Sequence, residues 1–228
     1  MRKLVLFDID GTLIRDGGAA AKAFDQAFDD LFGRPGASAA VDKHGRTDLA
    51  ICRDAARQAL GRDLRPEEIE TLQSRYLDRL PEALATSESY QVLPGVTALC
   101  SELAGDDRVL MGLQTGNLEP AAWTKLQRGN LADYFTFGGF GSDSPDRSVL
   151  VRMAIERGRA LADIDAAAIF VVGDAPGDIL AGRDNQARTV AVGTGLTGLD
   201  ALRPLQPDYL LPDLHDRDRF KSLLGLTG

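Results

Sequence analysis

The sequence has few cysteines and no long apolar run, and each absence narrows what the protein can be. Two cysteines occur in 228 residues, and the separation of Cys52 from Cys100 does not match the close spacing of a metal site. Each lies in an apolar segment of helical character, so we expect buried free thiols rather than a disulfide. No apolar segment approaches the roughly 20 residues of a membrane span. We therefore expect a protein of the reducing cytoplasm that has no membrane partner.

Excess basic charge is also lacking. The chain carries 26 Lys and Arg against 34 Asp and Glu, a formal net charge of −8. Nucleic-acid binding needs clustered Lys and Arg, and the sequence has no long basic run, so we expect no nucleic-acid partner. Most of the acidic residues should lie on solvated surface. Part of the acidity should form a cation site.

Short apolar runs alternate with helical patterns along most of the chain. The candidate strands are residues 3–8, 108–115, 167–174, 188–195 and, more weakly, 208–211. The candidate helices between them are residues 95–105, 119–129 and 147–161. Continuous apolar runs rich in β-branched residues are typical of buried strands in a parallel sheet. The alternation predicts an α/β fold.

The segment from Gly17 to Tyr90 differs, because it holds helical patterns and no convincing strand. The patterns cover residues 20–33, 47–61 and 66–85. We expect an all-helical cap at 17–88, inserted into an α/β core made of 1–16 and 89–228. Gly17–Gly18 and residues 90–95 are plausible hinges.

Polar residues stand at the ends of three candidate strands. They are Asp8 and Asp10 after the first, Thr115, Gly116 and Asn117 after the second, and Asp174 with Asp178 after the third. Ligands of an open parallel sheet collect at the carboxyl ends of its strands, so these residues should share one crevice. Carboxylates held close together repel unless a cation compensates. Oxygen-only ligands favour a hard cation, and we expect Mg²⁺.

Three motifs carry a resemblance to a known family. "DIDGTLI" (8–14), "LQTGN" (113–117) and "VVGDAPGDILAGRDNQARTVAV" (171–192) resemble the first, second and fourth motifs of the haloacid dehalogenase-like (HAD) superfamily, in matching order and spacing. The resemblance covers essentially the whole chain, including the helical insert. It implies a Rossmann-like core with an inserted cap and a Mg²⁺-dependent phosphomonoester hydrolase of the phosphoglycolate phosphatase-like branch, acting on a small phosphorylated metabolite.

The resemblance also implies roles for the acidic residues. Asp8 would attack phosphorus to form an aspartyl-phosphate. Asp10 would protonate the leaving alkoxide and then activate water. Asp8, the main-chain carbonyl of Asp10 and Asp174 would bind Mg²⁺, and Asp178 would bind through water or orient Asp174. The alternative for Asp8 and Asp10 is a helix-capping or turn pair without a catalytic role. The alternative for Asp178 is a simple charge at a helix N-terminus.

The second motif should hold phosphate. Thr115, Asn117 and nearby N–H groups would bind phosphate oxygens, and Gly116 would let the backbone come close. An ordinary helix start, with Asn117 as the cap ahead of Pro120, is an alternative that is compatible with this role.

The third motif departs from the usual family pattern. The family places a Lys or Arg beside the nucleophile, frequently in a "KP" pair that this chain lacks. "FGGFGSDSPDRSVLV" (137–151) resembles a branch in which Arg147 would neutralise Asp8 and the transition state. Lys125 and Arg152 are the alternatives, although "WTKLQRGNL" (123–131) predicts a helix with Lys125 on its surface.

The cap contains one polar turn, "HGRTD" (44–48), which resembles the loop that reaches over the active site in related phosphatases and sugar-phosphate mutases. Gly45 and Arg46 are candidates for recognising the non-phosphate end of the substrate. The alternative is a solvated loop with Thr47 as a helix cap. His44 has no obvious Ser or Cys partner, so a hydrolase triad is not expected.

Three other functions compete. A β-phosphoglucomutase-like phosphotransferase can share all the core motifs. A haloacid dehalogenase needs neither Mg²⁺ nor the second acid, so Asp10 and Asp174 argue against it. A non-catalytic binding protein would usually have lost the nucleophile or the metal site. The oligomeric state stays open between monomer and dimer.

Overall fold

The computed structural model describes residues 1–226, and its main element is a parallel sheet. Within that range six strands form the sheet in the order β5-β4-β1-β6-β7-β8, and every neighbouring pair is parallel. The strands are β1 (Arg2–Phe7), β4 (Val109–Thr115), β5 (Gly138–Phe140), β6 (Ile164–Gly173), β7 (Arg188–Val192) and β8 (Tyr209–Leu211). The predicted α/β fold is confirmed. The sequence missed β5, because three residues with two glycines give no apolar run.

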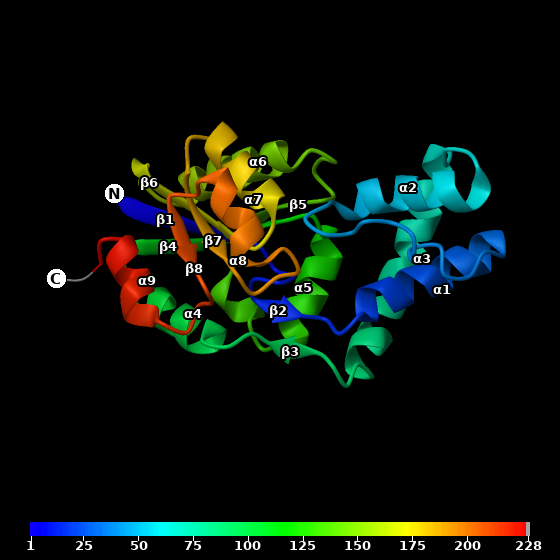
Figure 1. Cartoon of the computed structure of the whole chain (residues 1–228), viewed down its shortest axis with the longest axis horizontal. Coiled ribbons are helices and arrows are strands. Elements are labelled where there is room, and N and C mark those ends of the chain that lie inside the picture. The colour runs from blue at the N-terminus through cyan, green and yellow to red at the C-terminus, as the bar shows by residue number, and fades with distance from the viewer. Residues whose placement is uncertain (227–228) are drawn as a thin grey trace.

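Helices cover both faces of the sheet (Figure 1). They are α4 (Val96–Ala104), α5 (Glu119–Arg128), α6 (Arg147–Leu161), α7 (Pro176–Asp184), α8 (Gly198–Leu202) and α9 (Arg217–Leu223), with short 3₁₀ turns at Ala132–Tyr134 and Arg203–Leu205. Alternate residues of β1 face opposite sides. Val5 and Phe7 pack in one apolar cluster with α4, α5 and α9, whereas Leu4 and Leu6 pack in another with α6 and α7. This burial on both faces explains the continuous apolar run.

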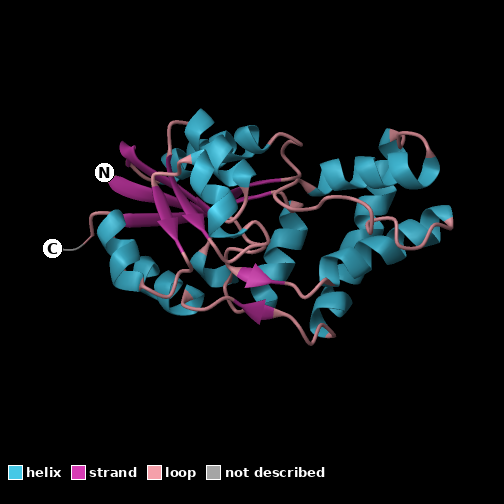
Figure 2. Cartoon of the chain, in the orientation of Figure 1, coloured by secondary structure: helices cyan, strands magenta, loops and turns pink. Residues whose placement is uncertain are grey.

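Three further helices lie together beyond one end of the sheet. They are α1 (Ala19–Phe32), α2 (Asp48–Leu60) and α3 (Pro66–Ala85), and they share an apolar cluster that Leu118 and Ala121 at the start of α5 also join. Figure 2 shows only helices and loops in this part of the molecule. The chain leaves and returns along β2 (Ile14–Arg15) and β3 (Gln91–Val92), which pair antiparallel. The division into a core and a cap at 17–88 stays a prediction, and this arrangement supports it.

Both cysteines are buried and free, as the sequence predicted. Burial raises the pKa of Cys52 and of Cys100 to about 12, so both thiols stay protonated near neutral pH. None of the helices in the described part of the chain has the length and apolar character needed to cross a membrane.

Candidate active site

The ends of three adjacent strands bring the predicted site residues together. β4, β1 and β6 are neighbours, and Phe7 of β1 is in register with Leu113 and Val172 on either side. Asp8 follows directly, and its backbone N–H donates to the Val172 carbonyl over 2.9 Å. Thr115 ends β4, and Asp174 follows β6. The sheet order therefore places the three motifs at one edge.

A buried acidic cluster forms there. Carboxylate oxygens of Asp8, Asp174 and Asp178 all lie within 4.8 Å of one another. Thr12 donates to one oxygen of Asp174 over 2.9 Å, and the backbone N–H of Ala175 donates to Asp178 over 2.9 Å. The other oxygen of Asp174 is buried without a hydrogen-bond partner among residues 1–226. An unsatisfied buried carboxylate oxygen in an all-oxygen cluster fits a hard divalent cation such as Mg²⁺.

The electrostatics of the cluster point the same way. Burial, reinforced by the neighbouring carboxylates, raises the pKa of Asp8 to about 7 and that of Asp174 to about 8. The cluster therefore holds more negative charge than its surroundings compensate. Either bound protons or a bound cation would neutralise this excess negative charge.

Arg147 reaches this cluster from the first turn of α6. Its Nη2 lies 2.9 Å from Asp8 Oδ1 and 2.7 Å from Asp178 Oδ1. Gln114, a polar residue inside the apolar β4 run, accepts from Arg147 Nε over 3.3 Å and donates to Asp178 over 2.8 Å. Arg152, one alternative for the third motif, is exposed.

Lys125 is not on the surface, and that prediction is wrong. Only 3% of its side chain is exposed, and its Nζ lies 2.6 Å from Asp10 Oδ2. The helix α5 buries the face that carries Ala121, Ala122, Lys125 and Leu126. Because 121 and 125 are one turn apart, the alanines were the signal that this lysine faces inward.

The second-motif residues are joined to each other and to Asp10. Asn117 Nδ2 donates to Asp10 Oδ2 over 2.7 Å and to Thr115 Oγ1 over 2.8 Å. The N-cap of α5 is Leu118, so Asn117 is not the cap that the alternative interpretation requires. A Cβ at Gly116 would lie 2.2 Å from the Arg46 carbonyl oxygen. Glycine at 116 thus allows the 44–48 loop to approach the motif.

The 44–48 loop docks on the site through its backbone and through the side chains of Asp48 and His44, for which the sequence predicts no role in the site. Asp48 N–H donates to the Gly116 carbonyl over 2.8 Å, and its carboxylate accepts from Leu118 N–H over 2.8 Å. Burial raises the pKa of Asp48 to about 6. His44 Nε2 contacts Thr197 Oγ1 and lies 3.8 Å from Asp174 Oδ2.

Of the two residues predicted to recognise the substrate, Gly45 lies beside the acidic cluster, whereas the Arg46 side chain pairs within the inserted helices. Gly45 lies against Ala175, which directly follows Asp174. The Arg46 side chain forms an ion pair with Asp54 of α2 at 2.6 Å. Thr47 is the N-cap of α2, and its hydroxyl accepts from Ala50 N–H. Gly45 is thus beside the acidic cluster, whereas the guanidinium of Arg46 is held by the helix that follows it.

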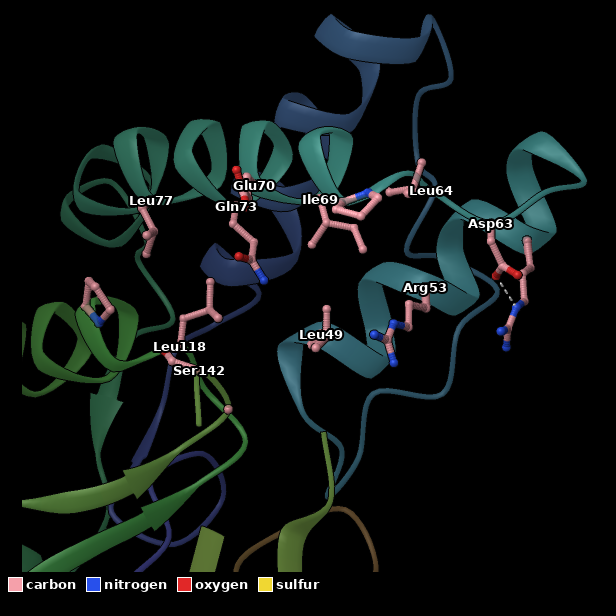
Figure 3. Close-up of a pocket in the computed structure, with 14 residues that line it drawn as sticks. Leu49, Arg53, Asp63, Leu64, Ile69, Glu70, Gln73, Leu77, Leu118 and Ser142 are labelled. Atoms are coloured by element: carbon pink, nitrogen blue, oxygen red, sulfur yellow. Dashed lines mark hydrogen bonds and ion pairs between the residues drawn. The ribbon is translucent and has the colours of Figure 1, made fainter. Parts of the chain in front are cut away.

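Beside the site, a pocket of about 740 Å³ lies between α2 and α3. Figure 3 shows Gln73 and Leu77 of α3 facing Leu49 of α2 and Leu118 of the core. Asp8, Asp10 and Asp174 do not line it. Leu118 directly follows Asn117, so the pocket borders the second motif.

Comparisons with known proteins agree with one another. A family model described as haloacid dehalogenase-like hydrolase matches residues 2–186. The pyrophosphatase PpaX of Halalkalibacterium halodurans is 26% identical over 215 residues, which are 93% of this chain and 94% of that protein.

Solved structures share the fold. A predicted phosphoglycolate phosphatase from Haemophilus somnus superposes with a TM-score of 0.73 at 17% identity, covering 96% of this chain and 98% of that one. A structure from Bacteroides vulgatus that carries the name β-phosphoglucomutase gives a TM-score of 0.70 at 21% identity, covering 98% of this chain and 89% of that one. At these identities the likeness shows the fold alone.

Proposed function

The chain belongs to the haloacid dehalogenase-like hydrolase family and is a phosphatase-type enzyme of that family, and on this basis we propose a function. We propose that it hydrolyses the phosphomonoester of a small metabolite with the help of Mg²⁺. The observation that carries the proposal is the environment of Asp8. This carboxylate is buried at the end of a central strand, where the Arg147 guanidinium contacts it and where oxygens of Asp174 and Asp178 lie within 4.8 Å. The arrangement supports Asp8 as nucleophile, Arg147 as charge neutraliser and the acidic cluster as cation site.

Mg²⁺ would be held by Asp8, the main-chain carbonyl of Asp10 and Asp174, with Asp178 next to them. When bound, it would neutralise charge on the phosphoryl group and let an anionic ester approach an anionic nucleophile. The donor set fits this ion because it consists of oxygens alone.

The first step belongs to Asp8 and Asp10. One carboxylate oxygen of Asp8 attacks phosphorus, the bond from phosphorus to the ester oxygen breaks, and the phosphoryl group is left on Asp8. The protonated carboxyl of Asp10 gives its proton to the departing oxygen. Arg147, 2.9 Å from Asp8, stabilises the charge on the phosphoryl oxygens during transfer.

The second step returns the enzyme to its starting state. Asp10, now a carboxylate, takes a proton from water as the water attacks phosphorus, and the bond between phosphorus and Asp8 breaks. Thr115 and nearby backbone N–H groups would bind the phosphate oxygens. Asn117 remains a candidate beside them, but its side chain would have to release Thr115 or Asp10 to take part. Inorganic phosphate then leaves.

Recognition of the rest of the substrate would fall to the cap. Gly45 and Arg46 remain our candidates, and Arg46 would have to exchange its Asp54 partner for the substrate. A phosphoglycolate phosphatase-like substrate is one option, and the α1–α3 unit would then act as a cap that closes over the ester. We also propose the reducing cytoplasm as its location, which fits two free buried thiols.

The test is a nucleophile replacement. Asp8→Asn should abolish Mg²⁺-dependent phosphate release from 4-nitrophenyl phosphate, because an amide oxygen is a far weaker nucleophile than a carboxylate. Asp29→Asn, the same change at an exposed position of α1, should leave turnover unchanged. Turnover of the Asp8→Asn variant close to that of the parent would show that another group attacks phosphorus.

A phosphotransferase would be recognised by its reaction products. With a sugar phosphate as substrate, a β-phosphoglucomutase-like enzyme would give a bisphosphate or an isomerised sugar phosphate instead of inorganic phosphate. Product analysis by ³¹P NMR separates the two functions. Free phosphate as the sole product supports hydrolysis.

A further inference from the structure

Two buried cations serve the site, and each contacts a different catalytic aspartate. Arg147 contacts Asp8, the proposed nucleophile, at 2.9 Å. Lys125 contacts Asp10, the proposed acid, at 2.6 Å. They come from opposite faces of the sheet, since α6 packs on the side of Leu4 and Leu6 and α5 on the side of Val5 and Phe7. The proposed mechanism uses Arg147 and leaves Lys125 without a role.

Lys125 is part of a closed triangle of hydrogen bonds. Its Nζ donates to Asp10 Oδ2 and, over 2.7 Å, to Asn117 Oδ1. Asn117 Nδ2 in turn donates to the same Asp10 oxygen over 2.7 Å. The amide of Asn117 is therefore used at both ends. Such a triangle defines the position of the Asp10 carboxyl group better than either bond alone.

Both bonds to Asp10 end on Oδ2, which leaves Oδ1 for the substrate. The Asp10 side chain is 41% exposed, so it reaches the surface of the crevice, whereas the Lys125 side chain is 3% exposed and lies behind it. Hydrogen bonds from behind to one oxygen fix the direction of the other. A general acid needs a fixed direction of its proton-donating oxygen, because proton transfer requires hydrogen-bond distance to the leaving oxygen.

Burying an ammonium group costs free energy unless partners compensate. Besides Asp10, Lys125 has only a more distant ion pair in the described part of the chain, with Asp16 at 3.9 Å. The helix that carries it is tied down as well, because Tyr90 Oη donates to the Lys125 carbonyl over 2.8 Å. The shortest contact of this lysine is thus with the catalytic acid.

We propose that Lys125, acting together with Asn117, is a positioning residue that aims Oδ1 of Asp10 at the leaving oxygen of the substrate. This inference rests on the proposed function, in which Asp10 is the acid. It separates two cationic tasks between two helices: Arg147 serves the phosphoryl group, and Lys125 serves the leaving group. Lys125 does not touch the substrate.

The test compares substrates that differ in their need for an acid. Nitrophenolate leaves without a proton, whereas the alkoxide of an alkyl phosphate such as glycerol phosphate needs one. Asp10 also activates water in the second step, which is the same for both substrates, so the comparison uses kcat/KM, which reports the steps up to departure of the leaving group. In Lys125→Met, kcat/KM for the alkyl phosphate should fall about 100-fold and that for 4-nitrophenyl phosphate less than about fivefold, because general-acid catalysis contributes about 10²-fold or more.

Three controls keep the result interpretable. Lys22→Met makes the same change at an exposed lysine of α1 and should alter neither substrate. Thermal melting and circular dichroism report whether Lys125→Met folds, and Lys125→Gln, which keeps a donor in the same place, takes over if it does not. Asp10→Asn should show the same selective loss of kcat/KM, and adding Lys125→Met to it should cause no further selective loss.

The outcomes separate this inference from the function beneath it. Equal loss on both substrates in a folded Lys125 variant, with selective loss in Asp10→Asn, would overturn the positioning role and leave the phosphatase mechanism intact. Equal loss on both substrates in Asp10→Asn itself would overturn the acid role and this inference with it. Selective loss in both variants supports the proposal.

Discussion

Arg147 stands among three carboxylates, and this imbalance governs the behaviour of single residues in the site. One guanidinium faces Asp8 and Asp178 directly, and Asp174 completes the cluster. Burial raises the pKa of Asp8 and of Asp174 far above the usual range for aspartate. The negative charge beyond what Arg147 offsets must be balanced by protons or by a cation.

The raised pKa values predict a pH-dependent stability of the metal-free protein. Folded-state pKa values of about 7 and about 8, against 3.8 as the ordinary value, mean that the folded form binds more protons than the unfolded chain in between. Stability contributed by these protons is therefore present below pH 4 and lost as the pH rises through 7 to 8. Thermal melting in a chelator should show Tm decreasing across this window.

Added Mg²⁺ should raise Tm more at pH 8 than at pH 5, because at low pH the cation competes with protons. Asp174→Asn removes one charge of the cluster and should reduce both the pH dependence and the Mg²⁺ response. A Tm that rises with pH in the chelator would contradict the burial of these charges.

Replacing Arg147 tests which cation belongs to the nucleophile. Arg147→Met should lower kcat by 10²-fold or more, on alkyl and aryl phosphates alike, because charge on the phosphoryl oxygens develops with both. Arg152→Met, a matched change at an exposed position of the same helix, should leave kcat unchanged. Steady-state kinetics on the two variants decide between the residues, and a larger loss in Arg152→Met would reverse the assignment.

At the scale of elements, the start of α2 is fastened to the second motif. Asp48 makes two hydrogen bonds to the backbone of Gly116 and Leu118, and Thr47 Oγ1 donates to the Pro145 carbonyl over 3.4 Å. A helix N-terminus with a carboxylate in its first turn is favourable in itself. Here the same residue also joins α2 to the strand end that carries the second motif.

Gly116→Ala should disturb this contact. The new Cβ would lie 2.2 Å from the Arg46 carbonyl oxygen, so the 44–48 loop would have to move away. We expect a loss of about 1–3 kcal/mol in unfolding free energy, as in other overpacked sites, and a raised KM. Urea unfolding and steady-state kinetics measure the two effects.

Gly105→Ala is the matched control. At the end of α4 an added Cβ would meet its nearest atom at 3.6 Å, an ordinary contact distance. This variant should keep both stability and KM close to those of the parent. If Gly116→Ala behaved in the same way, the close approach of the loop would not exist in solution.

On the scale of the whole molecule, the chain has separate apolar cores. One large cluster lies under the sheet around Phe7 and Leu99, and another lies among α1, α2 and α3 around Phe28 and Leu72. The antiparallel pair of β2 and β3 is where the chain passes between the sheet and these helices, as Figure 1 shows. The two clusters meet at Tyr90 and at Leu118 and Ala121 of the α5 region, while the rest of the second cluster packs within residues 17–88, so the two can open separately.

Leu72→Ala should therefore destabilise one part of the molecule selectively. Deleting a buried leucine side chain costs about 2–5 kcal/mol. Native-state hydrogen exchange should speed up in α1, α2 and α3, while amides of β1, β4 and β6 keep their protection. Leu99→Ala, buried in the other core, should give the opposite pattern. Uniform acceleration in both variants would mean that the chain unfolds as one unit.

The sequence by itself determined five of the six strands of the parallel sheet and the acidic residues of the site. Apolar runs buried on both faces have only one good solution, a central parallel strand, and parallel strands gather their ends at one edge. The pattern of residues alone was therefore enough to place Asp8 and Asp174 together. Thr12 and Gln114 lie within the first and second motifs but received no role, because a single polar residue gives no periodic signal.

Tertiary structure decided which cation meets which aspartate. Lys125 and Arg147 lie in helices on opposite faces of the sheet. Their side chains reach the same group of aspartates at the carboxyl ends of the strands. A charged residue on a helix is expected to face solvent unless a buried group of opposite charge pairs with it. The partner of Lys125 is Asp10, 115 positions away in the sequence, so packing rather than local pattern turned this lysine inward.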